Sequence, residues 1–231
     1  MIKKFHEKLQ EITESVNLMG KLVQEAVKGA VISLTEDNAE IAQKVIDGDD
    51  RIDDLEMKIE QDCLFIHAKY QPFARDLRLI NSMNIIAISL ERIGDLAVNL
   101  AKITRKLEKH KAMFMTPEIL DLIKEMAKLA KTVLSSALKA FKNHDVKLAA
   151  KLDEIDMEVD EIQRVIFKKL FASAVGNDEI NKEEFVLYLS SISLATRYLE
   201  RIGDQSVNIG ERILLSLTGD YKVLNDDINE G

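Results

Sequence analysis

Two short acidic segments hold the residues of this sequence whose types and spacing are best suited to chemistry. The segment "LERIGDLAVNLA" places Glu91 and Asp95 four residues apart, and "LERIGDQSVNIG" repeats the arrangement with Glu200 and Asp204. A spacing of four puts both carboxylates on one face of a helix, where like charges cost roughly a few tenths of a kcal/mol. Because the same costly arrangement occurs twice, we expect a bound partner that offsets the repulsion.

A second acidic pair precedes each of these segments. The stretch "DDRID" places Asp49 and Asp53 four residues apart, and "DMEVD" does the same with Asp156 and Asp160. Consecutive helices are usually neighbours in space, so the two pairs of each half are expected to converge. Four converging carboxylates form a cation site, and oxygen-only ligands suit Mg²⁺, Mn²⁺, Ca²⁺ or iron rather than copper.

Other residues in the two segments allow both a cation site and a simpler explanation. Gly94 and Gly203, between the carboxylates, are compatible with close packing of a neighbouring helix, and the amides of Asn99 and Asn208 are further ligand candidates. A single acidic pair is more often a solvated helix face, and Lys102 is typical of such a face. The joint recurrence of two pairs per half favours the cation site.

The elements that carry these pairs are predicted to be long helices. The chain has only two prolines and nine glycines, so the residues that end helices and form turns are scarce. Thr35 and Asp37 offer caps after the first helix, and Thr116 with Pro117 starts the fourth. Apolar residues recur with the helical period over 4–34, 37–69, 75–109, 117–142, 145–174 and 181–217.

The six predicted helices fall into two copies of one unit. Asp53 and Asp160 are separated by 107 residues and Glu91 and Glu200 by 109, which places two extra residues in a loop of the second copy. We therefore predict an all-α fold, a tandem duplication of a three-helix bundle with six long antiparallel helices. The first repeat covers 1–111 and the second 112–231.

Bulk properties narrow the class of protein. The net charge of −8 over 231 residues disfavours nucleic acid as a partner. The single cysteine, Cys63, excludes an intrachain disulfide and is interpreted as a buried apolar side chain. No apolar run is long enough to span a membrane, which predicts a cytoplasmic protein, with peripheral membrane association and a homodimer both left open.

In combination, these motifs resemble a known family. "ERIGD" followed by "AVN" or "SVN" in each repeat, together with "QPFARDLR" and "DDRID", is similar to the PhoU family of phosphate-signalling regulators over about residues 5–217. The resemblance implies two three-helix bundles that bind metal ions, with iron favoured, multinuclear sites allowed, and manganese, magnesium or zinc as alternatives. It also implies contact with a phosphate ABC transporter ATPase and a sensor histidine kinase, and negative regulation of phosphate-starvation genes. The implied metal ligands are Asp49, Asp53, Glu91, Asp95, Asp156, Asp160, Glu200 and Asp204.

The second copy departs from the family pattern, since it has "GNDEINKEEF" where the first has "QPFARDLR". For Arg75, Asp76 and Arg78, capping and pairing at the corner between two helices is favoured over phosphate binding.

We therefore expect a non-catalytic, metal-binding regulator of phosphate uptake. No Gly-rich phosphate loop or H-E-x-x-H motif is present. A carboxylate-bridged di-iron or di-manganese enzyme is the first alternative, but its Glu-x-x-His motif is missing, because Leu64, Leu107 and Phe141 stand three residues before His67, His110 and His144. A purely structural helical scaffold, which would bind no stoichiometric metal, is the second.

Overall fold

A computed structural model describes residues 2–107, 115–174, 182–220 and 223–224, and every regular element in these ranges is an α-helix. This confirms the predicted all-α fold with its internal repeat. The first repeat and the second repeat each contribute four helices to the described part of the chain. They are α1 (Ile2–Glu36), α2 (Ala39–Asp47), α3 (Asp50–Tyr70), α4 (Arg75–Leu107), α6 (Pro117–Asn143), α7 (Val146–Ala149), α8 (Leu152–Ala174) and α9 (Lys182–Thr218).

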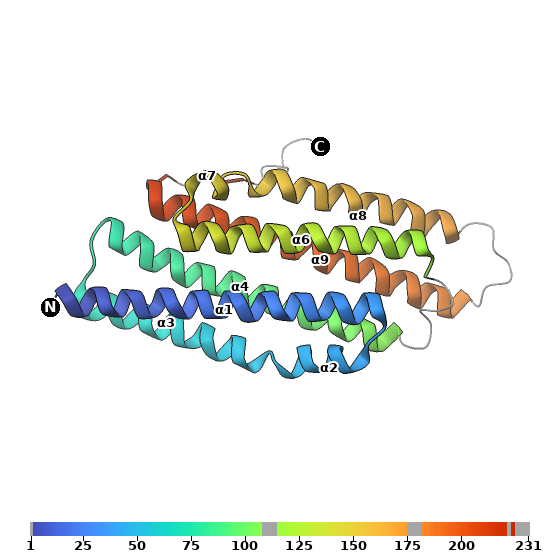
Figure 1. The fold of residues 1–231 in the computed structure, drawn as a ribbon, viewed down its shortest axis with the longest axis horizontal. Coiled ribbons are helices and arrows are strands. Elements are labelled where there is room, and N and C mark those ends of the chain that lie inside the picture. The colour runs from blue at the N-terminus through green and yellow to red at the C-terminus, as the bar shows by residue number, and fades with distance from the viewer. Residues whose placement is uncertain (1, 108–114, 175–181, 221–222, 225–231) are drawn as a thin grey trace.

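The two repeats lie side by side as elongated bundles, with α1 to α4 in one layer and α6 to α9 in the other (Figure 1). Helices α4 and α9 pack against each other along the middle of the molecule, and α1 also contacts α6. None of the described helices combines the length and apolarity needed to cross a bilayer.

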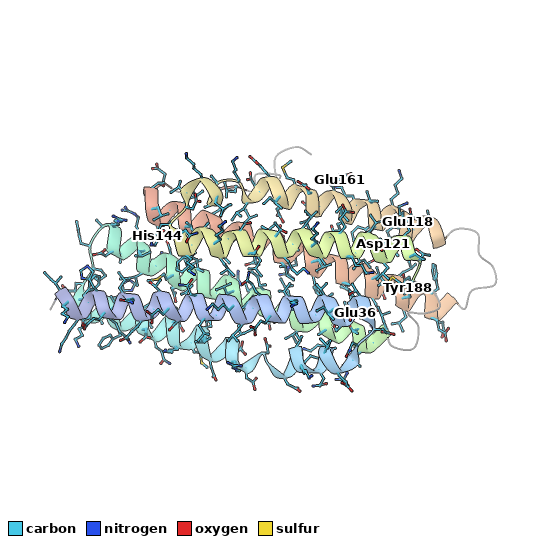
Figure 2. The ribbon with its side chains drawn as sticks, viewed as in Figure 1. Glu36, Glu118, Asp121, His144, Glu161 and Tyr188 are labelled. Atoms are coloured by element: carbon cyan, nitrogen blue, oxygen red, sulfur yellow. The ribbon has the colours of Figure 1, made fainter. Side chains whose placement is uncertain are left out.

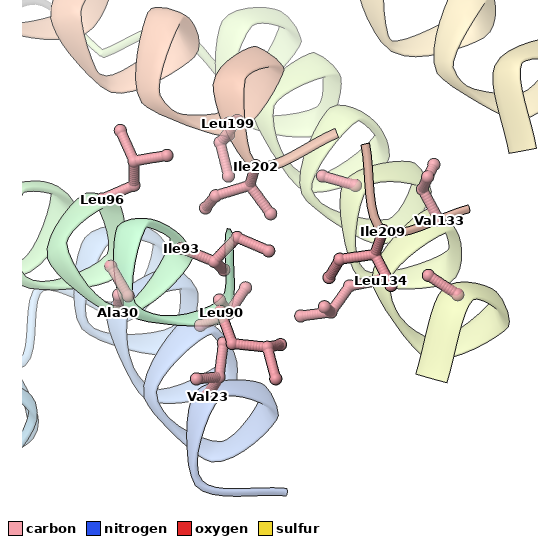
Figure 3. Packing of buried hydrophobic residues seen from close by; sticks show 14 of the residues in the cluster. Val23, Ala30, Leu90, Ile93, Leu96, Val133, Leu134, Leu199, Ile202 and Ile209 are labelled. Carbon is pink, nitrogen blue, oxygen red and sulfur yellow. The ribbon is translucent and has the colours of Figure 1, made fainter. Parts of the chain in front are cut away.

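Residues of the duplicated acidic segments form the centre of the core. Leu90 and Ile93 of α4 meet Leu199 and Ile202 of α9, and all four side chains are fully buried (Figure 3). Burial of side chains this large stabilises the fold by about 1.5 to 3 kcal/mol each. The apolar residues of each segment therefore face the seam between the repeats, which leaves the carboxylates of the same segment to face other helices.

Two of the six predicted helices are interrupted, and this is a correction. The stretch expected as one helix at 37–69 is divided into α2 and α3 at Gly48, whose N–H donates to the carbonyl of Val45. The stretch expected at 145–174 is divided into the one-turn α7 and α8 at Ala150. These breaks let each divided segment follow its neighbours, since both α2 and α3 contact α1 and α4.

The helix starts agree with the sequence prediction in two of three cases. The sequence offers Thr116 as the cap of the fourth predicted helix and Asn143 or Asp145 as the cap of the fifth. The side chains of Thr116 and Asp145 accept hydrogen bonds from the backbone at the starts of α6 and α7. The cap of α2 is Asn38 rather than Thr35 or Asp37, because Asp37 has a positive φ of 58° and ends the preceding helix. The sequence "VGND" at 175–178 predicts a turn, and these residues lie outside the described ones.

Charged side chains line the outer surfaces, as the labelled Glu118 on α6 and Glu161 on α8 illustrate (Figure 2). Glu118 accepts a hydrogen bond of 2.6 Å from Lys169 across these two helices. Tyr188, labelled in the same view, is instead buried, with its hydroxyl 3.5 Å from the sulfur of Met115.

The predicted burial of Cys63 is confirmed, and it leads to a chemical expectation. The side chain is 2% exposed, and burial raises the pKa of the thiol to about 12. Because the thiolate is the reactive form, we expect Cys63 to react with a thiol reagent at least a hundredfold more slowly in the folded protein than in denaturant. Thiol labelling followed by mass spectrometry checks this, and equal rates in the two conditions would contradict the burial.

Candidate metal centre

The first candidate site lies between α3 and α4. Asp49 is the residue before α3 and Asp53 is in its first turn, so the break at Gly48 sets where this acidic pair begins. Glu91 and Asp95 come from the middle of α4. Asp49 and Glu91 are half-buried, whereas Asp53 and Asp95 are exposed.

The carboxylates of the first site repel one another. Burial, followed by repulsion from Asp53 and Asp95, raises the pKa of Asp49 to about 6. Burial and then the charge of Asp95 also raise the pKa values of Asp53 and Glu91. The charge of Asp95 on α4 thus acts on Asp49 and Asp53 at the start of α3. Lys102 favours the charged form of Asp49 and so belongs to the surroundings of the site.

Gly94 makes the close approach of α3 and α4 feasible. A methyl group at this position would lie 3.2 Å from Ile52 Cδ1 and 3.6 Å from Asp49 Oδ1. The glycine therefore leaves room chiefly for the side chain of Ile52, while the carboxylate of Asp49 lies at ordinary contact distance.

The second candidate site repeats the arrangement between α8 and α9, in a more buried form. Asp156 is 4% exposed and Glu200 is 9% exposed, while Asp160 and Asp204 are half-buried. A methyl group at Gly203 would collide with the carboxylate of Asp156. The glycine of the second segment thus makes room for an aspartate, whereas Gly94 makes room chiefly for Ile52.

Burial dominates the electrostatics of this second site. It raises the pKa of Glu200 to about 7, with a further contribution from the charge of Asp204. The pKa of Asp204 is raised by burial and then by repulsion from Asp160. The predicted set of Asp160, Glu200 and Asp204 is therefore coupled across α8 and α9, and Asp156 joins it through its contact with Gly203.

The sequence analysis missed one charged residue of the second site. Arg197 lies one turn before Glu200 on α9, and its Nη1 is 2.5 Å from Glu200 Oε1. Its charge lowers the pKa values of Glu200 and Asp204, against the effect of burial. Aligning the two repeats would have identified this residue, because the position 109 residues before Arg197 is Ile88, which carries no charge.

The arrangement fits a cation in chemistry but is not a preformed cage. Each site offers carboxylate oxygens as ligands. In the second site a Cβ at Gly203 would fill the space of the Asp156 carboxylate, and Glu200 Oε2 is buried with no hydrogen bond from the described residues. Among those residues, no group of three or more His, Cys, Asp or Glu side chains is already close enough to hold a metal ion. A cation held by these carboxylates would offset the burial and the mutual repulsion that raise their pKa values.

The corner residues Arg75, Asp76 and Arg78 do not join either site. Asp76 is half-buried, and its N–H donates to the carbonyl of Phe73. Within the described part of the chain, neither arginine forms an ion pair with Asp76, which differs from the expected pairing. Arg78 instead packs near Gly219, at the end of α9, so this residue links the two repeats.

Comparison with known proteins places these features in a family. The sequence model of the PhoU domain matches residues 16–104 and 123–213. The phosphate-specific transport system accessory protein PhoU homolog 1 of Thermotoga maritima is 34% identical over 93% of this chain and 89% of its own length. A PhoU homolog of Caulobacter vibrioides is 32% identical over 95% of this chain and 92% of its own.

Solved structures give the same result. The crystal structure of PhoU from Pseudomonas aeruginosa superposes with a TM-score of 0.85 at 30% identity, covering 94% of this chain and 100% of that one. The phosphate transport system regulatory protein PhoU from Streptococcus pneumoniae superposes with a TM-score of 0.82 at 27% identity, covering 95% and 100%.

Proposed function

The chain belongs to the PhoU family, and from that membership we propose that it is a non-catalytic, metal-binding regulator of phosphate uptake and phosphate-starvation signalling. The relatives are named as accessory and regulatory proteins of phosphate transport, which supports a regulator rather than an enzyme. We place its action in the cytoplasm, through contact with the ATPase of a phosphate ABC transporter and a sensor histidine kinase.

One observation carries the metal-binding part of the proposal. In each repeat, carboxylates from two neighbouring helices are electrostatically coupled beside a glycine, and in the second repeat the glycine leaves space for an aspartate. A purely structural scaffold gains nothing from such an arrangement, because mutual repulsion and partial burial of carboxylates both destabilise it. A cation converts the repulsion into attraction, and iron or manganese on oxygen ligands satisfies this chemistry.

Metal analysis of three purified proteins tests this part. We expect wild type to bind metal at both sites, Glu91→Ala/Asp95→Ala to lose the first site, and Glu200→Ala/Asp204→Ala to lose the second. Each double variant should therefore retain about half of the wild-type metal, measured by inductively coupled plasma mass spectrometry after loading with Fe²⁺ or Mn²⁺. Equal metal content in all three proteins, or none in wild type, would refute metal binding at these residues.

The partner part needs a separate experiment. A pull-down with the metal-loaded protein should retain the transporter ATPase and the sensor kinase, and absence of both would refute the signalling assignment. An oxygen-consumption assay separates the regulator from a di-metal oxidase, since metal-dependent turnover would favour the enzyme.

A further inference from the structure

We propose that Arg197 is a built-in counter-ion of the second site, which holds Glu200 while metal is absent and has to leave when a cation binds. The two sites of the protein then differ in metal affinity, with the arginine weakening binding at the second site only. This inference rests on the proposed metal binding and adds a regulatory element to it.

The ion pair between Arg197 and Glu200 is strongly asymmetric in burial. Nη1 of Arg197 is 2.5 Å from Oε1 of Glu200, while the side chains are 57% and 11% exposed, respectively. The guanidinium can therefore move into water at little cost, whereas the carboxylate stays inside the site. A metal ion could therefore compete with the mobile guanidinium of Arg197 for the fixed carboxylate of Glu200.

Glu200 also keeps one oxygen available while the arginine is bound. Its Oε2 is buried and receives no hydrogen bond from any residue that the structure describes. Asp160 and Asp204 lie close enough to influence the charge of Glu200. Glu200 and these carboxylates would hold a cation at this site, and the charge of that cation would disfavour the guanidinium on the same carboxylate, because two positive charges repel each other.

The first site has no equivalent of this arginine. The position that corresponds to Arg197 is Ile88, while the neighbouring Arg201 has a counterpart in Arg92. The pKa of Glu91 in the first site is raised by burial and by neighbouring carboxylates, and the cation that opposes this shift is Arg92, the neighbouring residue. The counter-ion is therefore a property of the second repeat alone.

The experiment uses the full-length chain with the first site silenced by Glu91→Ala/Asp95→Ala. Chelator-treated protein is titrated with Mn²⁺ by calorimetry, and the Tm of the metal-free form is measured in parallel. We expect Arg197→Gln to tighten Mn²⁺ binding roughly fivefold to tenfold. It should also lower the metal-free Tm by a few degrees, because the buried Glu200 loses its partner.

Two further variants serve as controls. Arg201→Gln removes an equal charge that makes no ion pair with Glu200, so its effect on Mn²⁺ binding should be much smaller. In a protein with the second site silenced by Glu200→Ala/Asp204→Ala, Ile88→Arg should weaken Mn²⁺ binding at the first site. Unchanged or weaker Mn²⁺ binding in Arg197→Gln would overturn the counter-ion alone, whereas no Mn²⁺ binding before the Arg197 change would overturn the proposed metal function.

Discussion

The metal-free protein should become more stable as the pH falls from 8 to 5, the reverse of ordinary acid denaturation. The cause is the set of carboxylates whose pKa values are raised in the folded state, above all Glu200 at about 7 and Asp49 at about 6. Between the unfolded and folded pKa values, the folded protein binds more protons than the unfolded chain. Stability therefore decreases as the pH rises through this window.

The size of the effect is set mainly by Glu200, whose pKa is raised to about 7. Raising the pKa of Glu200 from 4.5 to about 7 corresponds to roughly 3 kcal/mol of unfolding free energy. That penalty is complete above pH 7 and is relieved as the pH falls toward 4.5. Asp53, Glu91 and Asp204 shift in the same direction and add to it.

Urea unfolding of chelator-treated protein at several pH values measures this dependence. In Glu200→Gln, which cannot ionise, the increase in stability toward pH 5 should be much smaller than in wild type. Saturating Mn²⁺ should reverse the trend, since protons compete with metal for the carboxylates. A metal-free stability that is constant or that increases from pH 5 to 8 would show that these carboxylates are not destabilised by folding.

The substitution Gly203→Ala should both destabilise the protein and impair the second site. The added methyl group would collide with the carboxylate of Asp156, which is 4% exposed and has little space into which to move. Overpacking of this kind costs typically about 1 to 3 kcal/mol. We expect the loss of stability to be accompanied by loss of metal from the second site, because Asp156 can relieve the collision only by leaving its position.

Gly94→Ala is the matched control for this substitution. Its methyl group would first meet the end of the Ile52 side chain at 3.2 Å, and a flexible side chain can shift. The gain in helix propensity of about 1 kcal/mol on replacing glycine offsets the tighter packing, so the net change should lie within about 1 kcal/mol. Chemical denaturation and metal analysis of both variants give the comparison. Equal effects at the two glycines would contradict the difference in their packing.

The sequence by itself determined the fold class, the duplication and the acidic pairs. Helical period and the spacing of four between carboxylates are local properties of the chain, so they can be read without knowledge of the packing. The spacing of four predicted that Glu91 and Asp95 lie side by side. The adjacency of consecutive helices predicted that the acidic pair of the preceding helix lies near them.

Only the tertiary structure decided where the long helices break and how the two sites differ. The division at Gly48 and the approach of Asp156 to Gly203 depend on contacts between helices that are distant in sequence. The carboxylates of the second site are more buried than Asp53 of the first. Packing also places the exposed Arg197 beside a buried carboxylate. Burial and proximity across helices are properties of the packed bundle, and the repeated motif is nearly the same in both halves. The difference in burial between the two sets of carboxylates therefore could not be predicted from the motif.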